Sequence, residues 1–220
     1  MLNTTARPHH RTTAPPIVGL IGGMGSGKSL IGEMFRQRGA RVISGDQLGH
    51  EALRQPDIRT AVAQRWGPGV VEADGSISRG RLAAIVFRTP QLRQALEALV
   101  FPWIERRLQE EIAAARACRE FLLIVLDAAI MLEAGWDKAC DWLVYVHAPR
   151  AERLRRLQEQ RGWGAKEVQE RESAQWSLTE KVSRADYAID NSDSPERAAQ
   201  QVDDLLRHWG VAQRTNAHGE

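Results

Sequence analysis

A glycine-rich turn, placed between an apolar stretch and a stretch of helical periodicity, narrows the possible folds of this chain. The segment reads GLIGGMGSGKSLIGEMF over residues 19–35. Gly22 and residues 27–29 fit the pattern Gly-x-x-x-x-Gly-Lys-Ser/Thr, the Walker A or phosphate loop, which follows a strand and opens a helix. Glycines let several backbone N–H groups converge on phosphate oxygens, and the helix N-terminus adds positive charge. The sequence therefore predicts nucleotide binding, since an accidental glycine-rich turn would not explain this context.

Each side chain of the phosphate loop has an expected task. Lys28 would neutralise the β- and γ-phosphates, and the Ser29 hydroxyl would bind the magnesium ion that bridges them. ATP and Mg²⁺ are therefore the expected cofactors. The loop residues predicted to contact the nucleotide are Gly23, Met24, Gly25, Ser26, Gly27, Lys28, Ser29 and Leu30.

Short β-rich runs are spaced along the chain and define the expected fold class. Most are apolar without alternation, which indicates a parallel sheet covered by helices on both faces, and hence an α/β fold. A helix is predicted over 29–39, and a long helical region interrupted near Pro102 is predicted over 90–117. The runs are IVGLI 17–21, a weaker RVIS 41–44, LLIVL 122–126, WLVYV 142–146 and YAI 187–189.

Two long intervals between these runs suggest how the chain is organised. Residues 47–118 separate two strands by far more than a usual crossover, so an inserted helical lobe is expected there. Residues 149–185 form a second, polar and helical excursion. We expect one domain over 17–210, with its core in 17–46, 119–148 and 186–210.

Composition restricts the partners and the compartment. The formal charge of +2 is too balanced for a protein whose main partner is a nucleic acid. Cys118 and Cys140 lack the spacing of a disulfide framework or a zinc site. No membrane-span-like apolar run or secretory signal is found, so a cytoplasmic protein without a membrane partner is expected. The polar ends, 1–16 and 211–220, are predicted to be disordered tails.

Two aspartates follow predicted strands, and each has a catalytic and a structural interpretation. Asp127 occupies the Walker B position and could support magnesium through water; a helix cap or strand-end carboxylate is the alternative. Asp46 ends the second strand, where small-molecule kinases place a base for the acceptor hydroxyl. Asp46 could equally cap a helix beginning near Leu48. The motifs of GTPase switches and transporter ATPases are absent from the sequence.

Several stretches, in this order, resemble the dephospho-coenzyme A kinase family. They are GLIGGMGSGKS, RVISGDQLGHEAL, RWGPGVVEADGSISRGRLAAIVF, VLDAAIMLEAGWDKACDWLVYVHAP and QWSLTEKVSRADYAIDNS. The resemblance implies a P-loop NTPase core with a five-stranded parallel sheet, a helical acceptor-binding lobe (47–118) and a helical lid (149–185) that closes over ATP. It also implies ATP-dependent phosphorylation of the ribose 3′-hydroxyl of dephospho-coenzyme A, with Asp46 as the catalytic base.

The resemblance assigns further residues to the acceptor and the lid. Arg79 would pair with acceptor phosphates and His50 would line the acceptor site, although each could be an ordinary surface residue. Asn191 would lie beside the adenine. The lid arginines Arg153, Arg156 and Arg161 are candidates to stabilise the transferring phosphoryl group, with Arg156 and Arg161 taken as catalytic; surface ion pairing is the alternative.

Departures from the family's usual pattern bear on acceptor recognition. They are Leu30 for a threonine, Ser44 for an aspartate, Phe101 for a histidine and Ala129 for a proline. The phosphate loop and Asp46 remain intact. Two alternatives therefore stay open: another small-molecule or nucleoside-monophosphate kinase, and a non-catalytic ATP-binding regulatory module. A monomer is expected in each case.

Tryptophans could also serve as stacking platforms. Most of them adjoin apolar segments, so burial in the core is predicted for Trp66, Trp103, Trp136 and Trp142. Trp163 differs because it lies in the lid-like turn RGWG, where an aromatic ring could cover a ligand.

Overall fold

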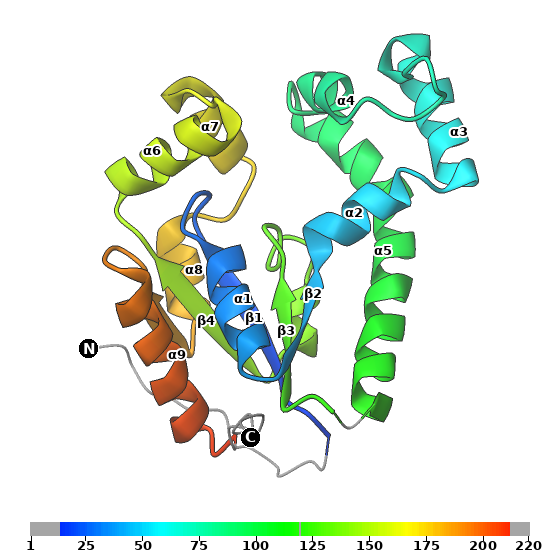
Figure 1. Cartoon of the computed structure of the whole chain (residues 1–220). Helices are drawn as coiled ribbons and strands as arrows, with labels where there is room; N and C mark the ends of the chain where they lie inside the picture. Colours follow the sequence, from blue (N-terminus) through cyan, green and yellow to red (C-terminus); the bar gives the residue numbers. More distant parts are fainter. Residues whose placement is uncertain (1–13, 119, 212–220) are drawn as a thin grey trace. The chain divides into compact units, whose positions relative to one another are not determined.

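The computed structural model describes residues 14–118 and 120–211 (Figure 1). The predicted disordered tails fall largely outside these residues. The described elements are β1 (Ile17–Gly22), α1 (Lys28–Gln37), β2 (Ala40–Ser44), α2 (Gly45–Ala52), α3 (Pro56–Trp66), η1 (Pro68–Val70), α4 (Arg79–Val86), α5 (Pro90–Cys118), β3 (Leu123–Asp127), η2 (Trp136–Ala139), β4 (Trp142–His147), α6 (Arg150–Arg161), α7 (Ala165–Glu172), α8 (Leu178–Arg184), β5 (Tyr187–Asp190) and α9 (Pro195–His208).

A five-stranded sheet in the order β2-β3-β1-β4-β5 forms the centre of the larger unit. The pairings of β1 with β3, β1 with β4 and β4 with β5 are parallel. Every residue of β1 and β3 is buried, as are the first five of β4, which explains why these strands are apolar without alternation. The predicted parallel α/β sheet is confirmed.

Helices cover both faces of this sheet. Helix α1 contacts β1, β3 and α9, whereas α8 contacts β1 and β4. Figure 1 shows α1 in front of the sheet and α8 behind it. Phe35 of α1 is fully buried in a core that includes Val18, Val125 and Val144. The apolar residues of the strands thus pack against apolar helix faces on both sides of the sheet. The loops that follow the strands begin at the carboxyl ends of those strands.

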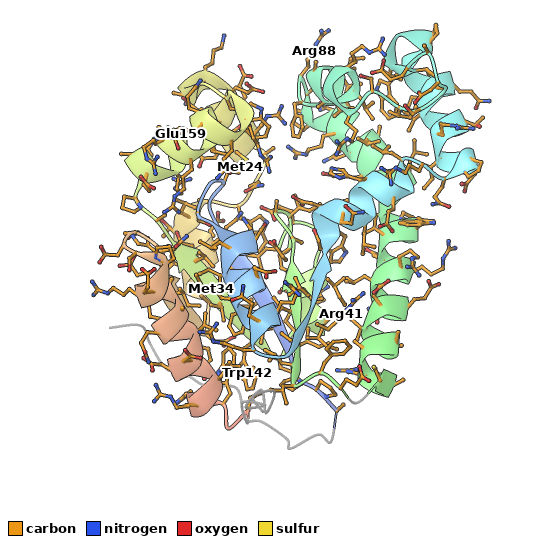
Figure 2. The ribbon with its side chains drawn as sticks, viewed as in Figure 1. Met24, Met34, Arg41, Arg88, Trp142 and Glu159 are labelled. Atoms are coloured by element: carbon orange, nitrogen blue, oxygen red, sulfur yellow. The ribbon has the colours of Figure 1, made fainter. Side chains whose placement is uncertain are left out.

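An aromatic cluster closes the end of the sheet opposite the phosphate loop. Trp142 stacks on Trp209 with ring centroids 4.5 Å apart, and Phe35 lies 6.1 Å from Trp209. Figure 2 shows Trp142 at the opposite end of the sheet from Met24. The core prediction is confirmed for Trp136 and Trp142, which are buried. It is wrong in degree for Trp66 and Trp103, which are only half-buried.

Helix α5 does not break where the sequence suggested. It runs as one helix of 29 residues with Pro102 inside it, so the predicted interruption is wrong. A proline inside a helix costs about 3 kcal/mol. Burying one large apolar side chain contributes roughly 1.5–3 kcal/mol, so a buried stripe outweighs that cost. The stripe consists of Val100, Ile104, Leu108, Ile112 and Ala115.

The described residues divide into two compact units. One comprises residues 14–43 and the described part of 112–211, and the other comprises residues 44–111. The smaller unit has its own apolar interior, which includes Ile58, Val62, Val70 and Leu82. It covers most of the segment expected to be an acceptor lobe, whose role stays a prediction. No helix among the described residues is both long and apolar enough to cross a bilayer.

Candidate functional site

The phosphate loop occupies the turn between β1 and α1. Its conformation depends on glycine at two positions, because Gly25 has φ +74° and Gly27 has φ +91°. A Cβ atom at Gly25 would lie 2.5 Å from the Arg153 carbonyl oxygen, and one at Gly27 would meet the Asn191 carboxamide. The loop can therefore keep this shape only with bare backbone at both positions.

The start of α1 presents backbone donors to the space around the loop. The Ile31 N–H donates to the Gly27 carbonyl over 3.1 Å, which is the helix's first backbone hydrogen bond. The N–H groups of residues 28–30 precede that bond and are the orphan donors of a helix N-terminus. Such donors, with the dipole behind them, suit an anion. Leu30, the last of these three residues, has 43% of its surface exposed.

A hydroxyl and a carboxylate meet beside the loop. Ser29 Oγ donates a 2.7 Å hydrogen bond to Asp127 Oδ2. Asp127 ends β3, whose register pairs it with Leu20 of β1, so parallel pairing brings the two segments to one edge of the sheet. The described residues contain no group of three or more His, Cys, Asp or Glu side chains arranged for a metal. Magnesium at a phosphate site needs only one or two protein oxygens, with phosphates and water completing the shell. This pair could supply them.

Two arginines of α6 contact the backbone of the phosphate loop. Arg153 of α6 is 4% exposed; its guanidinium donates to the Met24 carbonyl over 3.2 Å and pairs with Glu172. Arg156, one turn further on, donates to the Ser26 carbonyl over 3.4 Å. Figure 2 shows Met24 at the tip of the loop, beneath α6 and α7. Helix α6 thus presents two guanidinium groups to the phosphate loop.

Arg161 and Trp163 lie together at the far end of α6. The Arg161 guanidinium lies 4.8 Å from the centre of the Trp163 ring, and the Arg171 guanidinium lies 4.1 Å from it. Cation–π contacts of this kind stiffen the turn that joins α6 to α7. Arg156 thus contacts the phosphate loop and Arg161 contacts Trp163. The catalytic role of each arginine and the ligand-covering role of Trp163 stay predictions.

Arg155, which precedes the candidate Arg156, forms the surface ion pairs that were the alternative interpretation of the candidate arginines. Its guanidinium contacts the carboxylates of Glu152 and Glu159 over 2.7 Å on the exposed side of α6. The Arg155 hydrogen bond is the main cause that holds the pKa of Glu152 down at about 2, with Arg156 contributing. Arg156 shares Glu152 but also reaches the loop, which distinguishes it from its neighbour.

Asn191 is fastened to the same loop. Its side chain is 2% exposed and donates a 2.7 Å hydrogen bond to the Ser26 carbonyl. The Asn191 carbonyl accepts from Arg156 over 2.9 Å. Residues 26, 156 and 191 therefore form one hydrogen-bonded group. The expected contact of Asn191 with adenine stays a prediction.

The smaller unit gathers the three residues assigned to the acceptor. Asp46 and His50 are separated by four positions on α2 and so share a face of that helix. Arg79, at the start of α4, is in hydrogen-bond contact with His50 Nε2. Since arginine only donates, this His50 nitrogen acts as the acceptor. All three side chains are exposed.

The structure settles the capping alternative for Asp46. Helix α2 begins at Gly45, and its N-cap is Ser44, whose hydroxyl accepts from the Gln47 N–H over 3.2 Å. Asp46 lies inside the first turn and is not the cap. The serine that departs from the family's usual aspartate thus has a structural task.

A buried ion pair joins α8 to the segment after β3, and the sequence did not indicate it. Lys181 of α8 is 2% exposed, and its ammonium lies 3.6 Å from Glu133. Lys181 stands in a polar segment typical of a solvated helix, so the sequence carried no sign of its burial. Glu133 lies after β3 in the stretch AAIMLEAGW, whose other residues are apolar or small. The sequence therefore did not indicate a charged partner for Lys181 there.

Comparisons with known proteins identify the family of this chain. The family model described as dephospho-CoA kinase matches residues 16–196. Dephospho-CoA kinase of Geobacillus kaustophilus is 33% identical over 199 residues, covering 90% of this chain and 98% of the relative. The enzyme of Symbiobacterium thermophilum is 39% identical over 195 residues, covering 87% and 80%.

A solved structure extends the likeness to three dimensions. The crystal structure of TT1252 from Thermus thermophilus superposes with a TM-score of 0.76 at 32% identity, covering 89% of this chain and 98% of that one. Dephospho-CoA kinase from Campylobacter jejuni, at 18% identity and a TM-score of 0.59, shares the fold. With the family model and the relatives in agreement, the chain belongs to the dephospho-CoA kinase family.

Proposed function

We propose that the residues described above transfer the γ-phosphoryl group of ATP to the ribose 3′-hydroxyl of dephospho-coenzyme A, the last step of coenzyme A synthesis. As a member of its family the chain is a kinase, and membership implies ATP and dephospho-CoA as substrates. At the level of residues, the proposal rests on the hydrogen bond from Ser29 to Asp127, because it pairs a hydroxyl with a carboxylate beside the phosphate loop.

ATP would bind with its phosphates on the loop. The N–H groups at the start of α1 and the Lys28 ammonium would take the β- and γ-phosphates. Ser29 and Asp127 would hold Mg²⁺, which supplies neutralisation of charge on the phosphate oxygens when it is bound. Arg153 and Arg156 would add guanidinium donors from the lid, which suit the charge that spreads over the transferring group.

Asp46 would act as the base for the acceptor hydroxyl. Ser44 caps α2, so the Asp46 carboxylate is not required for that purpose. The side chain is exposed on the first turn of the helix. A carboxylate positioned to accept the proton contributes roughly 10²–10⁴ in rate, while positioning and charge neutralisation supply the rest.

His50 and Arg79 would recognise the acceptor. Their contact with each other places an imidazole and a guanidinium on the same unit as Asp46. Guanidinium groups bind phosphate through paired N–H donors, so Arg79 suits the phosphate groups of dephospho-CoA.

The proposal includes a monomeric, cytoplasmic enzyme that binds neither nucleic acid nor membrane. The net charge of +2 gives little attraction to a polyanion. Cys118 and Cys140, the two cysteines of the sequence, are not joined in a disulfide, as is usual in proteins of reducing compartments. Size-exclusion chromatography with light scattering would contradict the monomer if it returned twice the mass of the chain.

Coupled ADP release with MgATP, measured with and without dephospho-CoA, tests the reaction. We expect ADP to form only when the acceptor is present. Mass spectrometry should identify the product as coenzyme A, the 3′-phosphorylated form of the acceptor. A nucleoside monophosphate phosphorylated in preference to dephospho-CoA would support the alternative kinase. Nucleotide binding without transfer to any acceptor would support the regulatory module.

A further inference from the structure

The segment that returns from the lid to the core is attached through one carboxylate. Glu133 Oε1 accepts a 2.7 Å hydrogen bond from the Trp176 N–H, in the loop between α7 and α8. The same oxygen lies 3.6 Å from the Lys181 ammonium. Lys181 also donates to Gln175 Oε1 over 2.9 Å. Glu133 therefore joins the core to both the loop that ends the lid and the helix that follows it.

Both charged side chains of this attachment are largely buried. The Lys181 side chain is 3% exposed and the Glu133 side chain 15%. Glu133 Oε2 is buried and has no hydrogen-bond partner among the described residues. Each charge therefore depends on the other, since an unpaired charge in such surroundings is strongly unfavourable. A pair of this kind fixes position more than it adds stability.

The anchored segment lies against the phosphate loop. A Cβ atom built on Gly23 would lie 3.2 Å from Leu178 Cδ2 and 2.6 Å from Arg153 Nη1. Arg153 in turn pairs with Glu172, which ends α7, and donates to the Met24 carbonyl. The first half of the loop thus lies against Leu178 of α8 and against the Arg153–Glu172 pair.

We propose that Glu133 and Lys181 are positioning residues for ATP: they anchor the returning segment 173–181 and, through Leu178 and Arg153, hold the phosphate loop in its binding shape. The inference rests on the proposed nucleotide site. Neither residue is proposed to contact the phosphates. Small displacements of oriented binding groups are costly, about 10²-fold per ångström in catalytic sites, so loss of the anchor should weaken phosphate binding.

Calorimetric titration with MgADP tests the anchor without any turnover. We expect Lys181→Met to weaken MgADP binding about tenfold or more, and Lys181→Arg, which keeps the charge, to stay within about threefold. Arg38→Met is the matched control, because it breaks a partly buried pair with Asp203 that joins α1 to α9 away from the anchor. The control should lower the melting temperature and leave MgADP affinity within about twofold.

Two results would overturn the proposal. One is a folded Lys181→Met protein that binds MgADP as the wild type does; the other is an equal loss of affinity in Arg38→Met. If Lys181→Met does not fold, Glu133→Gln with Lys181→Met removes both buried charges and keeps an acceptor for the Trp176 N–H, and the same criteria apply to it. Wild-type turnover with dephospho-CoA tests the proposed function separately, so failure of the anchor and failure of the function are distinguishable.

Discussion

Ser29 and Asp127 are 98 positions apart in the sequence and meet in a 2.7 Å hydrogen bond. The contact follows from the topology, because β1 and β3 are parallel neighbours and the residues after them emerge at one edge of the sheet. Open parallel sheets place their ligands at that edge. The hydroxyl and the carboxylate therefore occupy the place where a phosphate-bound magnesium ion would need them.

Replacing Asp127 with asparagine should change the response to magnesium. Asparagine keeps a carbonyl oxygen for the Ser29 hydroxyl but removes the charge that attracts a hard cation. We expect the magnesium concentration for half-maximal turnover to rise about tenfold, in line with lost outer-shell support. Rates measured against magnesium at saturating substrates give this value. Asp57→Asn, on the exposed first turn of α3, is the control; an unchanged magnesium response in Asp127→Asn would remove Asp127 from the metal site.

Asp46 and Ser44 should separate into a chemical and a structural role. Asp46→Asn should lower kcat by about 10²–10⁴ with little change in MgADP affinity. Ser44→Ala should instead cost about 1 kcal/mol of stability through the lost cap, with kcat preserved. Steady-state kinetics and urea unfolding of both variants measure the two effects. Near-normal turnover in Asp46→Asn would contradict its role as the base.

The strands and the phosphate loop could be predicted because each is determined by a short, contiguous sequence pattern. Continuous apolar runs mark buried parallel strands, and the glycines at 25 and 27 are required by positive φ angles within the loop itself. The interruption at Pro102 was predicted wrongly because a local rule was overridden by burial along the whole of α5. Lys181 escaped prediction because burial of a charge depends on a partner far away in the sequence, here Glu133.

Arg156 should matter more than its neighbour Arg155. Arg156 donates to the Ser26 and Asn191 carbonyls. Arg155 instead pairs with Glu152 and Glu159 along α6. Lysine cannot reproduce the planar fork that makes two such bonds. We expect Arg156→Lys to lower kcat/KM for ATP about tenfold or more and Arg155→Lys to stay near the wild-type value. Equal effects in the two variants would assign Arg156 to surface pairing.

Gly25 and Gly49 should respond oppositely to alanine. Gly25 has φ +74°, and a Cβ atom there would lie 2.5 Å from the Arg153 carbonyl. The left-handed conformation alone costs a residue with Cβ about 1–2 kcal/mol, and the clash adds to it. Gly25→Ala should therefore abolish measurable MgADP binding. Gly49 lies inside α2 with nothing within 4 Å of its added Cβ, so Gly49→Ala should raise stability by about 0.5–1 kcal/mol. MgADP binding by a folded Gly25→Ala protein would show that the loop can relax.

Alkaline pH should raise the stability contributed at Lys181 while lowering nucleotide affinity. Burial lowers the pKa of Lys181 from its ordinary 10.5, helped by Lys28 and opposed by Glu133 and Glu172. Since the folded chain holds this proton less tightly than the unfolded chain, the cost of the buried ammonium is fully present below the lowered pKa. It is relieved as the pH rises from that pKa towards 10.5.

The anchor predicts the opposite trend for binding, because Glu133 loses its partner when Lys181 is deprotonated. We expect MgADP affinity to fall over this pH range in the wild type, and the fall to move to higher pH in Lys181→Arg, whose guanidinium stays charged. Calorimetry from about pH 8 to about pH 10 on both proteins measures this difference. Identical pH profiles would mean that the charge of Lys181 does not affect the phosphate loop.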